Sequence, residues 1–140
     1  MLFNLSSTTQ DRSFSVPAYR RPVAAAALAA LQVMRQEPEH AARVNLIASK
    51  MRKAFQEMGF NTGNSATPII PIIIGDTQRA FVMWKLLFQN GIFVNVAIPP
   101  AVLEGRQLLR TSFMASHTEE QLNQVLKTFE TVGKQVGLIK

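Results

Sequence analysis

The apolar residues of this chain recur at two kinds of spacing, and together they predict seven secondary-structure elements. A spacing of three and four residues predicts helices at 22–36, 39–58, 77–90 and from 119 to beyond 132. Short, mostly apolar runs predict strands at 68–74, 92–98 and 108–114. Because a few strands are interleaved with helices, this order predicts an α+β fold in which a small sheet has helices packed on one face.

Residues near the expected ends of these elements support the predicted bounds. Pro22 suits the first position of a helix, where the missing N–H has no partner to lose, and Asp76 suits an N-cap. Thr118 followed by Gln121 matches a capping box for the last helix. Gly59 is a natural helix stop. The ends of most helices are therefore predicted from local chemistry alone.

Some elements carry further expectations about packing. The run 68–74 does not alternate, which predicts a strand buried on both faces, and its two prolines predict an edge position or a kinked entry. The first helix is so rich in alanine that we expect it to pack closely against another element. The predicted third helix, 77–90, carries the apolar side chains Phe81, Trp84, Leu87 and Phe88.

Length and composition indicate one folded domain. The chain has 140 residues, of which 47% are hydrophobic and 17% charged. It has no cysteine, which excludes disulfides and thiolate metal sites and fits a cytoplasmic protein. Two histidines, His40 and His117, are too few for a histidine-based metal site, so we expect no metal.

Neither a membrane nor a nucleic acid is indicated as a partner. The longest apolar run, 23–31, is well short of the ~20 residues that a spanning helix needs, and the first residues lack the features of a signal peptide. The formal net charge is +6, but the basic residues are spread along the chain rather than clustered. Solvated helix faces explain this charge better than a nucleic-acid footprint.

Arg110 is the residue with the most informative position. It lies inside an apolar, strand-like run, and a buried guanidinium needs an anionic partner such as a carboxylate or phosphate. The alternative is that Arg110 points to solvent from a half-exposed strand. Lys85, beside Trp84 in an apolar helix, is the one lysine that is a candidate Schiff-base nucleophile. The alternative, which we expect, is that its long side chain reaches water. Residue chemistry alone thus predicts an anion-binding candidate and no catalytic machinery.

Several blocks in register resemble the C-terminal portion of the α-oxoamine synthases, over about 22–139. These are pyridoxal-phosphate (PLP)-dependent acyl-CoA:amino acid C-acyltransferases, and they include 8-amino-7-oxononanoate synthase, glycine C-acetyltransferase, 5-aminolevulinate synthase and serine palmitoyltransferase. The blocks are the alanine-rich run 23–31, Met58-Gly59-Phe60-Asn61-Thr62-Gly63, Thr67-Pro68-Ile69-Ile70-Pro71, Gly91-Ile92-Phe93-Val94, Pro99-Pro100, Glu104-Gly105, Leu109-Arg110 and His117-Thr118-Glu119-Glu120.

The resemblance implies that 22–140 form the small C-terminal domain of a fold type I PLP-dependent transferase, after an irregular arm at 1–21. This domain would have a small, mostly antiparallel sheet. Arg110 would bind the α-carboxylate of an amino acid substrate. The complete enzyme would be a cytoplasmic homodimer that condenses the amino acid with an acyl-CoA, decarboxylates, and releases an aminoketone, in lipid or biotin biosynthesis.

The resemblance also implies what these residues lack. In the family, the Schiff-base lysine, the histidine that stacks on the cofactor and the aspartate that pairs with its ring nitrogen precede the matching region. We therefore expect this chain to be inactive alone and to bind no PLP without the rest of the enzyme. No cofactor-phosphate role is assigned to Ser13 or Ser15, because the segment around them departs from the family pattern.

Two further features bear on this interpretation. Leu108 stands where many biosynthetic members of the family have another arginine. The amino-acid sequence around Arg110 is more similar to that of bacterial serine palmitoyltransferases. The alternative function is a non-catalytic α+β protein-interaction module, which would use the alanine-rich helix and the face formed by Phe81, Trp84 and Phe88.

Overall fold

A computed structural model describes residues 20–140. These residues fall into two compact units, which divide between Glu37 and Pro38. The described part of the first unit is helix α1 (Arg20–Gln36), which begins two residues before the predicted Pro22. Every side chain described in α1 is exposed, including Leu28 and Leu31. The described residues of this unit therefore include no element that covers the alanine-rich helix.

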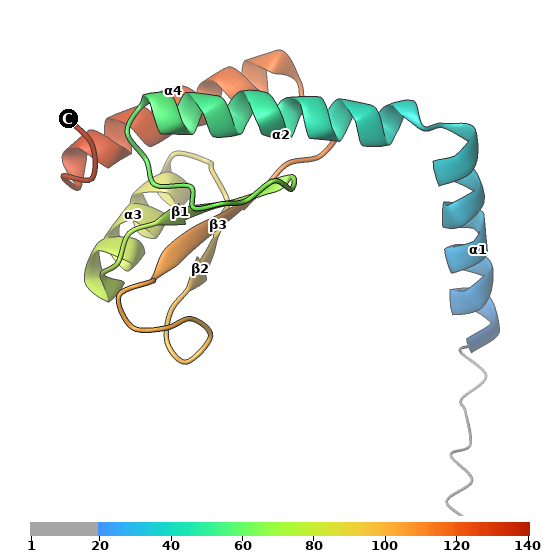
Figure 1. The fold of residues 1–140 in the computed structure, drawn as a ribbon, viewed down its shortest axis with the longest axis horizontal. Coiled ribbons are helices and arrows are strands. Elements are labelled where there is room, and N and C mark those ends of the chain that lie inside the picture. Colours follow the sequence, from blue (N-terminus) through green and yellow to red (C-terminus); the bar gives the residue numbers. More distant parts are fainter. Residues whose placement is uncertain (1–19) are drawn as a thin grey trace, which may run out of the picture. The chain divides into compact units, whose positions relative to one another are not determined.

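The second unit is a three-stranded sheet with three helices. The strands are β1 (Ile69–Ile73), β2 (Asn95–Ala97) and β3 (Leu108–Ser112), and the helices are α2 (Glu39–Glu57), α3 (Thr77–Gln89) and α4 (Glu119–Gln135). Strand β3 lies in the centre and is antiparallel to both neighbours, in the order β1-β3-β2 (Figure 1).

The helices cover one face of this sheet. Ile70, Ile72 and Leu109 are fully buried on that face, and they share one core with residues of α2, α3 and α4. On the other face Arg110 and Ser112 are exposed. The predicted α+β fold, with a small antiparallel sheet and helices on one side, is confirmed.

Strand β1 corrects one prediction and confirms another. Its side chains alternate between exposed or half-exposed and buried positions, so the expected burial on both faces is wrong. The reason is that helices cover a single face, and an apolar run cannot by itself report how many faces are covered. The predicted edge position is confirmed, because β1 is an outer strand of the described sheet, and a single bridge from Ile73 to Asn61 is its one pairing outside β3. An edge strand tolerates Pro71, which has no N–H to donate.

Most predicted helix ends are present as expected. The Asp76 carboxylate accepts a hydrogen bond from the Arg79 backbone N–H at 2.7 Å, which caps α3. Thr118 and Gln121 form both hydrogen bonds of the capping box at the start of α4. Gly59 follows α2 with a φ of +97°, a conformation that favours glycine.

Aromatic rings from three segments form the centre of the core. Phe55 of α2 lies 4.9 Å from Phe129 of α4, measured between ring centroids, and Phe60 lies 6.0 Å from each of them. On α3 the buried side chains are Ala80, Met83 and Leu87. Of the apolar residues noted there from sequence, Leu87 is buried, whereas Phe81 and Phe88 are exposed.

Candidate functional site

Arg110 lies at the middle of the uncovered face of the sheet. Its backbone pairs with Pro71 of β1 on one side and with Asn95 of β2 on the other. The side chain is exposed, so the guanidinium is not a buried charge that must have a partner. Among residues 20–140 it makes no hydrogen bond or ion pair, which leaves its fork of N–H donors open to an anion.

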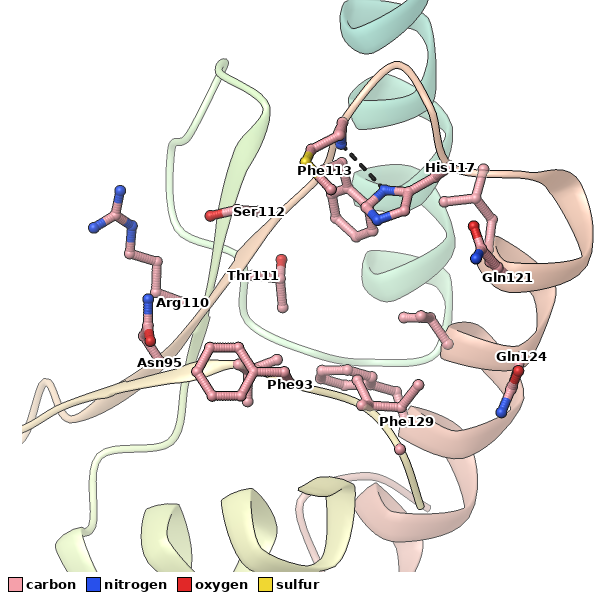
Figure 2. Close-up of a pocket in the computed structure, with 16 residues that line it drawn as sticks. Phe93, Asn95, Arg110, Thr111, Ser112, Phe113, His117, Gln121, Gln124 and Phe129 are labelled. Carbon is pink, nitrogen blue, oxygen red and sulfur yellow. Dashed lines mark hydrogen bonds between the residues drawn. The ribbon is translucent and has the colours of Figure 1, made fainter. Parts of the chain in front are cut away.

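Two polar side chains flank Arg110 on the same face. Ser112 stands two residues further along β3, and Asn95 is directly opposite on β2. Both are exposed. Figure 2 shows these three residues at one side of a pocket, with the guanidinium directed away from the aromatic rings. A hydroxyl and an amide thus lie beside the guanidinium, where each can add a hydrogen bond to a bound carboxylate.

The pocket has a volume of about 530 Å³ and lies between the segment leading into β2, the end of β3 and α4. Large apolar side chains make up much of its wall, among them Phe93, Phe113, Leu122 and Phe129. In Figure 2 the polar residues of α4, Gln121 and Gln124, are on the side away from Arg110. The pocket is therefore apolar between two polar borders.

His117 contributes a ring to this pocket. Its Nδ1 accepts a hydrogen bond from the Met114 backbone N–H at 3.1 Å, so the proton of the neutral ring is on Nε2. The ring stands edge-on to Phe113, with centroids 6.1 Å apart. Sequence reasoning did not place His117 in a pocket. The resemblance to the family included the motif 117–120, but a sequence motif does not show which way the His117 ring points.

The family model for aminotransferase class I and II matches residues 8–129. The chain belongs to this family. It is 42% identical over 118 residues to the serine palmitoyltransferase of Caulobacter vibrioides, a match that covers 84% of this chain and 29% of the relative. It is 39% identical over 117 residues to the 8-amino-7-oxononanoate synthase of Symbiobacterium thermophilum, covering 84% of this chain and 30% of that relative.

Solved structures agree with these relatives. The serine palmitoyltransferase of Sphingomonas wittichii superimposes with a TM-score of 0.68 at 34% identity, covering 71% of this chain and 25% of that one. A high-resolution structure of serine palmitoyltransferase with PLP gives a TM-score of 0.67 at 35% identity, with 70% and 25% covered. The predicted resemblance is confirmed. The chain spans about three tenths of the length of the curated relatives it matches.

The described residues do not by themselves fit PLP, a cofactor that enzymes hold as a Schiff base with a lysine amine. No lysine lines the pocket beside Arg110. Every lysine among residues 20–140 is exposed, whereas a Schiff-base lysine is activated by desolvation or by another cation nearby. Lys85, which the sequence singled out, is exposed like the others. No chemical step is therefore derived through PLP on these residues.

Other sequence candidates lie away from this pocket. Phe81 and Phe88 of α3 are exposed, and Phe88 stacks on Trp84 with centroids 5.8 Å apart. The expected arm at 1–21, with Ser13 and Ser15, lies largely outside the described residues. Within the described part of the chain, no helix is long and apolar enough to cross a membrane.

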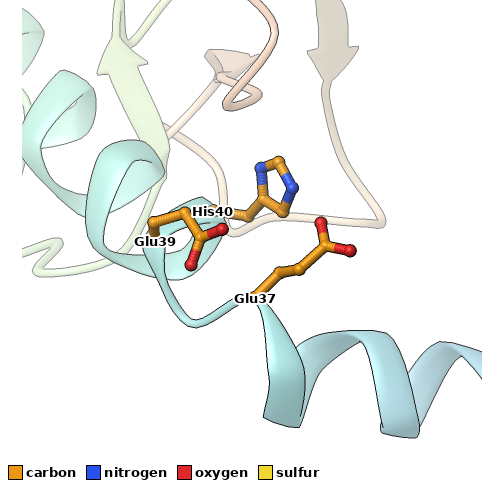
Figure 3. A group of neighbouring side chains, drawn as sticks. All are labelled: Glu37, Glu39 and His40. Atoms are coloured by element: carbon orange, nitrogen blue, oxygen red, sulfur yellow. The ribbon is translucent and has the colours of Figure 1, made fainter.

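Three possible metal ligands follow one another closely in sequence between α1 and α2: Glu37, Glu39 and His40 (Figure 3). Glu37 belongs to the first unit, whereas Glu39 and His40 belong to the second, so the three do not form a site within one unit. Glu37 and His40 each have interactions of their own. Exposed acidic groups are common without an ion, and these residues carry no metal assignment.

Proposed function

We propose that residues 22–140 form the C-terminal domain of a PLP-dependent acyl-CoA:amino acid C-acyltransferase, and that Arg110 holds the substrate carboxylate. Family membership and similarity to serine palmitoyltransferases and 8-amino-7-oxononanoate synthases support this class of reaction. The observation that carries the proposal is the open guanidinium of Arg110 at the centre of the uncovered sheet face.

The role of Arg110 is to orient the amino acid. Two parallel N–H···O hydrogen bonds from a guanidinium fix both the position and the plane of a carboxylate. Because the carboxylate carbon is bonded to Cα, holding its plane restricts the direction of the Cα bonds that change in the reaction. Asn95 and Ser112 flank the guanidinium and can complete the set of donors.

The overall reaction that we propose joins two substrates into an aminoketone and releases coenzyme A and CO₂. A bond forms between the amino acid Cα and the acyl carbonyl carbon, and the thioester C–S bond breaks to release coenzyme A. The carboxyl group leaves as CO₂, one proton is taken up, and an aminoketone remains. PLP supplies the electron sink for this chemistry when it is bound.

The cofactor site and the oligomeric state belong to the same proposal. The relatives are about three times as long as the matched region, and the exposed lysines of this chain offer no cofactor site. We therefore propose that the cofactor-binding part comes from outside these 140 residues, and that the assembled enzyme is a cytoplasmic homodimer. The chain alone is then inactive. A visible absorbance band from PLP held by the isolated chain would contradict this.

The experiment replaces the aligned 118 residues of the Caulobacter vibrioides relative with those of this chain. The resulting chimera should form the aminoketone. Arg110→Ala should raise the amino acid KM on the order of a hundredfold, which corresponds to the loss of about 3 kcal/mol of charge-assisted hydrogen bonding. The acyl-CoA KM and the bound PLP should change little.

Arg106→Ala is the matched control, because Arg106 is also exposed but lies in the loop before β3. It should leave the amino acid KM unchanged. If Arg110→Ala instead removes PLP, or leaves the amino acid KM as it was, Arg110 does not bind the substrate carboxylate.

A further inference from the structure

The pocket beside Arg110 is larger than the space that a bound amino acid would fill. Its volume of about 530 Å³ lies within the roughly 300–1,000 Å³ of small-molecule sites, and a carboxylate held at its border leaves most of that space free. The wall between the polar borders is apolar, with Phe93, Phe113, Val125 and Phe129 from three different segments (Figure 2).

Two large apolar side chains of this wall are left in water. Phe93 is 73% exposed and Met114 is 58% exposed, although both line the pocket. Exposed apolar area of this kind indicates a surface that another apolar group covers. Arg110 is the one Lys, Arg, Asp or Glu side chain among the lining residues, and it lies at the border rather than among the rings. The interior therefore favours an uncharged, apolar occupant.

The carbon–carbon bond that forms in the proposed reaction determines where the acyl chain begins relative to the bound amino acid. The acyl carbonyl carbon becomes bonded to Cα, which is itself bonded to the carboxylate carbon. If Arg110 holds the carboxylate, the first atoms of the acyl chain lie within a few bond lengths of that carboxylate. The apolar pocket borders on the residue that holds the carboxylate, because Arg110 and Thr111 are part of its lining.

We propose that this pocket receives the long apolar chain of the acyl donor. The inference rests on the proposed function and adds the location of the second substrate. Phe93 and Met114 contact the chain from the sheet side and Val125 from α4, while the Nε2–H of His117 offers a hydrogen bond to an acyl oxygen. The pocket then makes the enzyme selective for chain length, since each buried methylene tightens binding about fourfold.

The test uses the 140-residue chain and a neutral probe, cis-parinaric acid methyl ester, whose fluorescence rises in an apolar site. We expect saturable binding that saturated methyl esters displace better as their chains lengthen. Val125→Trp should weaken ester binding at least about tenfold, because the indole fills the pocket from α4. Leu126→Trp is the matched control. Leu126 is the next residue, is also half-buried against the core, and does not line the pocket.

A second pair of variants keeps the test decisive if a tryptophan in these half-buried positions unfolds the chain. Gln124 and Asn123 are both exposed on α4, but only Gln124 is among the lining residues. Gln124→Trp should weaken ester binding and Asn123→Trp should not. If the ester does not bind, or if pocket and control variants behave alike, the inference is wrong.

The ester also separates this inference from the proposed function. It carries no charge for the guanidinium of Arg110 to bind, so ester binding to the isolated chain reports on the apolar pocket and not on the carboxylate site. Failure of the pocket shows as loss of ester binding. Failure of the carboxylate site shows as an unchanged amino acid KM for Arg110→Ala in the chimera.

Discussion

At the scale of the residue, Gly133 shows how closely this small core is packed. A Cβ at this position of α4 would lie 2.5 Å from Cζ of Phe60 and 3.1 Å from Cδ1 of Ile139. Phe60 is itself held against Phe55 and Phe129, so its ring has little room to move. A glycine inside a helix normally costs stability, and here its small size is what lets α4 approach Phe60.

Gly133→Ala should therefore destabilise the chain. The clash should lower the free energy of unfolding by about 1–3 kcal/mol, which exceeds the gain of about 1 kcal/mol from the better helix propensity of alanine. Urea denaturation followed by circular dichroism measures the difference. Gln135→Ala, at an exposed position on the same helix, should change the free energy of unfolding little. A Gly133→Ala variant as stable as the parent chain would show that Phe60 can move aside.

At the scale of the element, the start of α4 combines several interactions. The capping box of Thr118 and Gln121 satisfies backbone groups at this end, and Glu119 forms an ion pair with Lys50 of α2. The pKa of Glu120 is lowered below its ordinary value, mainly because the Glu120 backbone N–H and then the Thr118 side chain hydrogen-bond to the charged carboxylate. The first turn of α4 is thus stabilised by negative charge.

The lowered pKa of Glu120 makes a prediction about pH. A carboxylate whose pKa is lower in the folded state stabilises the fold above its unfolded pKa, about 4.3 for glutamate. This contribution disappears as the pH falls through the lower folded-state pKa. Glu120→Gln should thus unfold at a lower temperature than the parent chain at neutral pH, with the gap closing in acid. Thermal unfolding at a series of pH values measures this gap, and a gap independent of pH would contradict the assignment.

At the scale of the whole molecule, the described residues leave one face of the sheet and the apolar side chains of α1 exposed. Ile69 on the open face of β1 is 38% exposed, and Leu28 on α1 is 58% exposed. The chain also spans about three tenths of the length of its relatives. These observations fit a domain whose open surfaces are covered in the assembled enzyme that we propose.

Ile69→Thr tests whether the open sheet face is covered in the assembled enzyme. In the isolated chain this change should alter the free energy of unfolding by no more than about 0.5 kcal/mol, because Ile69 is already exposed to water. In the chimera it should lower the thermal unfolding midpoint, because a hydroxyl replaces an apolar contact at the covered face.

The neighbouring Ile70→Thr provides the contrast. Ile70 is fully buried, so this variant should destabilise both the isolated chain and the chimera by roughly 1–3 kcal/mol. If Ile69→Thr has equally small effects in both proteins, the open sheet face does not contact the rest of the enzyme.

The sequence by itself determined the elements and most of their ends. The order of helices and strands, the Asp76 cap and the capping box at Thr118 all agree with the structure. These features were predictable because they depend on residues three or four positions apart, whose hydrogen bonds form within one turn of chain. The two prolines of 68–74, which lack an N–H, predicted an edge position or a kinked entry, and β1 lies at the edge of the described sheet.

The tertiary structure alone decided which surfaces those elements bury. An apolar run such as β1 is compatible with one or two covered faces, and α3 could bury either Phe81 or Met83, because both are apolar and differ only in direction. The candidate site also depends on contacts between segments that are distant in sequence. The position of Arg110 in a strand was visible in the sequence, but its open face and the pocket beside it required β2, β3 and α4 to come together. Contacts between distant segments determine these surfaces, and no local pattern records them.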